Sequence, residues 1–146
     1  MKTMVLAFLL CIMGTVVFAG IKTSIPHENQ VILKGDWTPT AEQTMKALTA
    51  IQTFLENPKG QSAWKQSEIK KILVNSSKYR VQFKGVLEKN RKYIKCNFFR
   101  ASGDKDDFPN WKKEEIIVDD GGFWFWQIDY DIHRGKCLNF SSNGYA

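Results

Sequence analysis

The stretch Val118-Asp119-Asp120-Gly121-Gly122-Phe123-Trp124-Phe125-Trp126-Gln127-Ile128-Asp129-Tyr130-Asp131 decides the fold of this chain. Its four consecutive aromatic residues favour a strand over a helix, and the two glycines before them predict a bulge or a sharp bend. Side chains alternate between the two faces of a strand. One face is therefore expected to carry a core row of Trp124, Trp126, Ile128, Tyr130 and Ile132, and the other to carry Phe123, Phe125, Gln127, Asp129 and Asp131.

The second of these faces begins with two Phe rings and ends with carboxylates, so its apolar half needs a cover. One candidate cover is the apolar segment 31–33, folded back over the sheet as an intramolecular strap. The alternative is a partner protein or a second copy of the chain, because an exposed apolar patch often marks an interface. On the second view we expect the binding residues to be Phe123, Phe125, Asp129 and Asp131.

Two helices are predicted before the strands. The first is expected over about 39–57, with apolar residues three and four apart at Met45, Leu48, Ile51 and Leu55. Its start is either Thr38 followed by Pro39, or Thr40 with Gln43 completing a capping box. A shorter second helix is expected over 62–74, with Trp64 on its apolar side.

From residue 79 the pattern changes to the alternation that is typical of half-buried strands. A hairpin centred on Lys89-Asn90 would place Phe83 opposite Cys96. A long polar loop over 101–114 follows, anchored by Phe108 and Trp111, and from Glu115 onward the chain would enter the aromatic strand. A second hairpin at 133–136 leads into a last strand over 137–145. The predicted fold is therefore α+β, with an N-terminal helix packed on a four-stranded antiparallel meander.

The first nineteen residues are interpreted as a signal peptide. Lys2 precedes an apolar run over 5–17, and Val17-Phe18-Ala19 predicts cleavage before Gly20. A membrane span is disfavoured, because the run is short and lacks a charged flank. The predicted organisation is a signal peptide over 1–19, a leader or short strand over 20–36, and a single α+β domain over 37–146. The protein would be exported to the periplasm or the extracellular space.

The expected mature chain has a charge of about +5, since Lys2 is the only charged residue removed with the signal. Its basic residues are spread along the sequence, which favours solvated faces of amphipathic elements over a polyanion-binding surface. Nucleic acid is not an expected partner of an exported chain.

Two cysteines remain after processing, and they are not expected to bond to each other. In a meander the aromatic strand separates their strands, so their Cα atoms would lie about 9.6 Å apart, beyond the reach of a disulfide. The cysteine and histidine spacing does not support a metal site, and no cofactor is predicted. His27, His133 and Cys96 lack the sequence context of a catalytic set. Asp129 and Asp131 are interpreted as cross-strand partners of Lys or Arg side chains rather than as an acid–base pair.

Several segments resemble a family of small exported bacterial proteins of unknown function. The resemblance covers about 37–146 and is carried by Lys78-Tyr79-Arg80-Val81-Gln82-Phe83-Lys84-Gly85, by Lys95-Cys96-Asn97-Phe98-Phe99, by the Asp119-Asp120-Gly121-Gly122 strand, and by Asn143-Gly144-Tyr145-Ala146. It implies a cystatin-like fold, or less closely the nuclear transport factor 2-like cone, together with export. The inhibitory Q-x-V-x-G hairpin of true cystatins is not matched, because Gln82 lies three residues before Gly85 instead of four.

These observations favour an exported, non-enzymatic binding or interaction module whose target is a protein or a small ligand. The alternative is a pocket between helix and sheet that binds a small apolar ligand or supports an enzyme. A closed core with an exposed Phe patch would favour the first hypothesis. A deep cavity lined by Trp64, Trp124 or Trp126 would favour the second.

Overall fold

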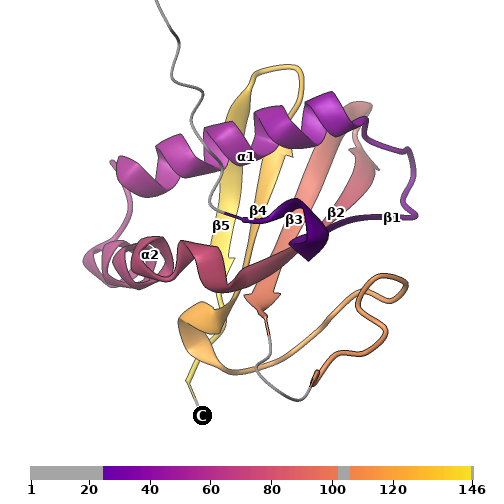
Figure 1. The fold of residues 1–146 in the computed structure, drawn as a ribbon. Coiled ribbons are helices and arrows are strands. Elements are labelled where there is room, and N and C mark those ends of the chain that lie inside the picture. Colours follow the sequence, from indigo (N-terminus) through magenta and orange to yellow (C-terminus); the bar gives the residue numbers. More distant parts are fainter. Residues whose placement is uncertain (1–24, 102–105, 146) are drawn as a thin grey trace, which may run out of the picture.

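The computed structural model describes residues 25–101 and 106–145, and it confirms the predicted α+β class. Two α-helices lie on one face of a five-stranded sheet (Figure 1). The strands follow chain order across the sheet: β1 (Gln30–Leu33), β2 (Tyr79–Glu88), β3 (Arg91–Arg100), β4 (Phe125–Asp131) and β5 (Lys136–Ser142). Three short 3-10 helices complete the fold: η1 (His27–Asn29), η2 (Ser76–Lys78) and η3 (Gly122–Trp124). The predicted signal peptide lies outside the described residues.

The prediction of a four-stranded antiparallel sheet is wrong in one respect, since β1 adds a fifth strand that runs parallel to β2. Parallel neighbours need a long crossover connection. Here both helices supply it, because they lie between β1 and β2 in the chain. Segment 31–33 is therefore part of an edge strand, and it does not form the strap that was one of the two candidate covers for the face with Phe123 and Phe125.

The first helix, α1 (Ala41–Glu56), begins after Thr40 and not after Thr38, so the second of the two predicted starts is the correct one. Thr40 and Gln43 form a reciprocal capping box, with Gln43 N donating to Thr40 Oγ1 at 3.2 Å and Thr40 N donating to Gln43 Oε1 at 2.9 Å. The buried stripe contains Thr44, Ala47, Leu48, Ile51 and Leu55. Met45 was expected in this buried stripe, but it is 64% exposed. Thr44 is buried instead, and its hydroxyl donates a hydrogen bond to Ala41 O.

The second helix, α2 (Ala63–Val74), is capped by Ser62 and buries Glu68, Ile69 and Ile72. Trp64, which was expected on its apolar side, is 50% exposed. Both helices cover the sheet face that carries the core row of β2, β3 and β4. Trp126 stacks on Phe98 at the centre of this core, with their ring centroids 3.8 Å apart.

The predicted hairpin between β2 and β3 is confirmed. Lys89 and Asn90 both have positive φ, 48° and 62°, as a two-residue turn of type I′ requires. The resulting register places Phe83 opposite Cys96, as predicted. Cys96 and Cys137 are both free thiols, and β4 lies between their strands.

The glycine pair before the aromatic run does make the predicted bend, but the bend changes the expected strand. Gly121 and Gly122 have φ values of 91° and 57°, and the chain then passes through η3. Strand β4 consequently starts at Phe125 and not near Glu115. Phe123 and Trp124 lie in the 3-10 turn, so the strict alternation of faces applies only from Phe125 onward.

Candidate functional site

The two β-hairpins lie at the same end of the sheet. In an antiparallel meander the β2–β3 and β4–β5 turns point the same way, whereas the β3–β4 connection lies at the opposite end (Figure 1). The second turn is closed by Gly135, which has a φ of 65° and donates its N–H to Asp131 O at 2.8 Å. We call residues 87–92 and 131–136 the hairpin end.

An open cleft lies between the two hairpins. It is lined by Leu87, Asn90, Arg91, Lys92, Asp131, Ile132, His133 and Arg134. The hairpin end carries five lysine or arginine side chains, all exposed: Lys89, Arg91, Lys92, Arg134 and Lys136. The fold thus gathers basic residues that are more than forty positions apart in the chain.

Asp131 is one of the residues that line this cleft, and its carboxylate interacts with groups of its own turn. Its side chain is 3% exposed, and Oδ1 accepts hydrogen bonds from the backbone N–H groups of His133 at 2.9 Å and Arg134 at 3.0 Å. These bonds, led by that from Arg134, hold the pKa of Asp131 below its usual range. The Arg134 Nε lies 3.8 Å from Oδ2. Asp131 therefore fixes the turn and positions Arg134 instead of projecting a negative charge into the solvent.

Two more carboxylates are found here, Glu88 within the hairpin end and Asp36 next to it. Asp36 accepts a hydrogen bond from Leu87 N at 2.9 Å, and Glu88 lies opposite Arg91 in the strand register. Lys92 lies over the ring of Trp37, with Nζ 5.2 Å from the centroid. The hairpin end thus has five cations and three nearby carboxylates, and one of these carboxylates, that of Asp131, is buried in its own turn. The exposed surface is therefore positively charged.

The expected binding residues are not brought together into one site. Asp129 shares a sheet face with Asp131, but its Oδ2 accepts a hydrogen bond from Asn139 Nδ2 at 2.8 Å. Each carboxylate thus has its own partner. Asp131 contacts Arg134 within its own turn and not a cross-strand cation, so the predicted cross-strand pairing is wrong for this residue.

The two Phe residues are separated as well. Phe125 is half-buried beneath Phe108, with their ring centroids 6.0 Å apart. Phe123 belongs to η3, where its ring packs on Trp124 at 4.6 Å and lies 5.7 Å from Lys71 Nζ. Phe108 and Trp111 anchor their loop as predicted, since both rings pack on Phe99. The predicted covers were segment 31–33 or a partner, but segment 106–116 is the one that lies over Phe125, so Phe123 and Phe125 do not form an exposed pair.

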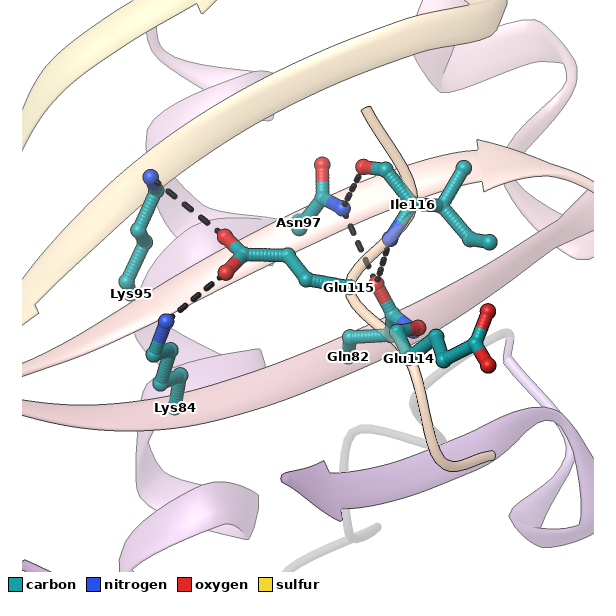
Figure 2. Close-up of polar contacts among 7 residues, drawn as sticks. All are labelled: Gln82, Lys84, Lys95, Asn97, Glu114, Glu115 and Ile116. Carbon is teal, nitrogen blue, oxygen red and sulfur yellow. Dashed lines mark hydrogen bonds and ion pairs between the residues drawn. The ribbon is translucent and has the colours of Figure 1, made fainter. Parts of the chain in front are cut away.

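Buried amides fix this cover to the sheet (Figure 2). Gln82 Nε2 donates to Trp111 O at 2.5 Å and to Glu114 O at 2.6 Å, while its Oε1 accepts from Ile116 N at 2.9 Å. Asn97 Nδ2 donates to Ile116 O at 2.8 Å. Because Gln82 is 1% exposed, these bonds replace its contact with water.

Glu115 adds an ionic contact at the edge of the same cover. Its carboxylate lies between two lysines, 2.7 Å from Lys84 Nζ and 3.6 Å from Lys95 Nζ (Figure 2). The hydrogen bond from Lys84, followed by the charges of Lys84 and Lys95, holds the pKa of Glu115 below its usual range. We interpret this polar cluster as structural, since each of its groups serves to attach segment 111–116.

A second polar cluster fixes the C-terminal residues. Glu68 is 1% exposed, with Oε2 accepting from the Tyr145 hydroxyl at 2.8 Å and Oε1 accepting from Lys71 Nζ at 2.8 Å. The Tyr145 ring lies against Gly122, where an added Cβ would come within 2.2 Å of it. Sequence reasoning missed this contact, because it joins residues that are far apart in the chain.

The space between helices and sheet does not form a deep ligand pocket. Its walls include Ile51, Ile72, Tyr79 and Trp126, and Ile25 covers it from the N-terminal side. About 20 Å³ is left for the centre of a water molecule, which is room for roughly one water. The Trp126 Nε1 has no hydrogen-bond partner among the described residues.

Residues 25–101 and 106–145 contain no group of three or more His, Cys, Asp or Glu side chains that could hold a metal ion. In the same part of the chain, no helix has both the length and the apolar character needed to cross a membrane. The chain matches no protein-family model, and comparisons with curated proteins and with solved structures find no match either.

Proposed function

We propose that this protein is an exported, non-enzymatic binding module that holds an anionic partner at its hairpin end. One observation carries the proposal: two adjacent hairpins gather five lysine and arginine side chains at one end of the sheet, and three of them, Arg91, Lys92 and Arg134, line an open cleft. The carboxylate in that cleft, Asp131, is tied to its own turn. Export and the resemblance to a small bacterial family are parts of this proposal that rest on the sequence, through the signal-peptide pattern and the quoted motifs.

A small-ligand pocket is the weaker candidate. The internal space holds roughly one water, whereas ligand pockets commonly measure about 300–1,000 Å³. The exposed basic cleft offers a larger surface, and its charge suits a polyanion or a negatively charged surface.

The test uses fluorescently labelled inorganic polyphosphate as the probe, with fluorescence anisotropy as the readout. We expect the purified protein to bind polyphosphate with an affinity that falls linearly with salt on a double-logarithmic plot, as counterion release requires. The Arg91→Gln/Lys92→Gln variant should bind more weakly and show a shallower salt dependence.

A matched control removes the same charge elsewhere. Lys59 and Lys70 are exposed and belong to the α1–α2 side of the molecule. A Lys59→Gln/Lys70→Gln variant should keep most of the binding. Equal losses in the two double variants would show that total charge, and not the hairpin end, governs binding, and the proposal would fail.

A further inference from the structure

The hairpin end also presents apolar side chains among its cations. Leu87 is 51% exposed at the end of β2, and the half-buried Ile132 lies across the same cleft. Both continue the helix-facing rows of their strands, Leu87 after Phe83 and Gly85, and Ile132 after Tyr130. Leu87 is exposed at this end of its strand, whereas Ile132 packs partly against the core and presents only part of its side chain to the cleft.

An aromatic ring lies beside them. Trp37 is half-buried, and its Nε1 donates to Val86 O at 3.1 Å, one residue before Leu87. Its ring faces Lys92 at 5.2 Å from Nζ. Tryptophan, which has an apolar ring and a polar N–H, and lysine, which has a long apolar stem and a charged end, are both favoured at the boundary between lipid headgroups and water.

We propose that the hairpin end docks on an anionic lipid bilayer surface, with Leu87 entering the headgroup region beside the exposed part of Ile132 and the surrounding lysines and arginines contacting lipid phosphates. This inference rests on the proposed function and names its partner. A soluble polyanion would use the cations alone. A bilayer surface would use the cations and the apolar side chains together, and so matches the whole composition of the cleft.

The protein would lie on the bilayer and not span it. Each lysine or arginine near an anionic surface contributes about a fivefold factor in partitioning. Burying the exposed half of a leucine side chain contributes a factor of similar size. Several such contributions give reversible binding that weakens as salt screens the cations.

The experiment compares two kinds of vesicle and one soluble probe. The purified protein is cosedimented with vesicles of phosphatidylglycerol mixed into phosphatidylcholine, with vesicles of pure phosphatidylcholine, and its binding to inorganic polyphosphate is measured in parallel. We expect salt-sensitive binding to the anionic vesicles and little binding to the neutral ones.

The decisive variant is Leu87→Ser. It should weaken binding to anionic vesicles about fivefold and leave polyphosphate binding unchanged, because it removes no charge. The matched control is Val74→Ser, which removes an apolar side chain that is 78% exposed on α2, and it should leave vesicle binding unchanged. Circular dichroism on each variant confirms that it is folded.

A gain-of-function variant gives an independent readout. Leu87→Trp should strengthen binding to anionic vesicles and add a blue-shifted component to the fluorescence emission that neutral vesicles do not produce. Polyphosphate binding without vesicle binding would overturn the lipid inference and leave the proposed function intact. Loss of both would overturn the proposed function. Vesicle binding that Leu87→Ser does not alter would show that the apolar residues take no part, and would also overturn the inference.

Discussion

Gln82 and Asn97 lie directly opposite each other on β2 and β3, and Asn97 Nδ2 donates a hydrogen bond to Gln82 Oε1 at 3.1 Å inside the protein. With the bonds to Trp111, Glu114 and Ile116, both hydrogens and both lone pairs of the Gln82 amide have partners. A pair of buried amides therefore joins the sheet to the segment that covers its second face.

This arrangement predicts a large effect for Gln82→Ala. The substitution removes the partner of the buried Trp111 carbonyl and of one buried Asn97 amide hydrogen. It also removes the partner of the partly buried Glu114 carbonyl and Ile116 N–H. Each buried group left unsatisfied costs about 1–3 kcal/mol. We expect the free energy of unfolding to fall by about 3 kcal/mol, measured by urea denaturation, and hydrogen exchange at Ile116 N–H to accelerate. The control Gln66→Ala removes an exposed amide and should change stability by less than about 0.5 kcal/mol. Unchanged exchange at Ile116 would contradict the role assigned to Gln82.

The C-terminal contact predicts an effect for Tyr145→Phe, which removes the hydroxyl that donates to Glu68 Oε2. The buried carboxylate would then keep its contact with Lys71 but lose its hydroxyl donor, so we expect a loss of about 1–3 kcal/mol in the free energy of unfolding. Tyr93→Phe, on the outer face of β3, is the matched control and should be close to neutral. A Tyr145→Phe protein as stable as the parent would show that the contact does not hold the C-terminus.

The cysteines predict slow thiol chemistry in the folded protein. Burial raises the pKa of the Cys137 thiol to about 12 and also raises that of Cys96. At pH 8 the thiolate fraction of Cys137 should be about a thousandfold below that of an ordinary cysteine, and alkylation should slow accordingly. Iodoacetamide labelling followed by mass spectrometry measures this rate. In denaturant without reductant both thiols should react rapidly with iodoacetamide. If neither reacts, the two cysteines form a disulfide, which would contradict the strand order.

Asp131 predicts a specific acid sensitivity. Its pKa is lowered in the folded protein, so its contribution to stability is present above the unfolded pKa of about 3.9 and is lost as pH falls through the lower folded value. Asp131→Asn should therefore be less stable than the parent at neutral pH. The difference should shrink as the pH falls below about 4, in urea denaturation at a series of pH values. A difference that is independent of pH would mean that the carboxylate charge does not stabilise the turn.

Local patterns predicted the elements that short-range chemistry controls. The Thr40–Gln43 capping box and the Lys89-Asn90 turn are set by neighbouring residues, and the turn then fixes Phe83 opposite Cys96. Phe123 was misplaced because two successive glycines with positive φ turn the chain into η3 before the strand begins. Alternation along a strand could not reveal that turn.

The contacts between segments far apart in the chain could be identified only from the three-dimensional structure. The pairing of β1 with β2 and the attachment of segment 111–116 to Gln82 join residues about thirty to fifty positions apart. The basic hairpin end was not predicted, because the spread of basic residues along the sequence favoured solvated faces over a polyanion-binding surface. Both turns had been identified, however, and a meander places alternate turns at one end of the sheet. The sequence pattern did not show that Lys89, Arg91 and Lys92 of one turn share a surface with Arg134 and Lys136 of the other.

The central claim, that the hairpin end binds the anionic partner, is tested most directly by two-dimensional NMR of the isotope-labelled protein titrated with inorganic polyphosphate. Backbone amide shifts should change first and most at 87–92 and 131–136, and the changes should reverse when salt is added. The chemical shifts of backbone amides around Phe125 and Asp129, on the second sheet face, should not change. Shifts concentrated on that face, or spread evenly over all exposed lysines, would contradict the account.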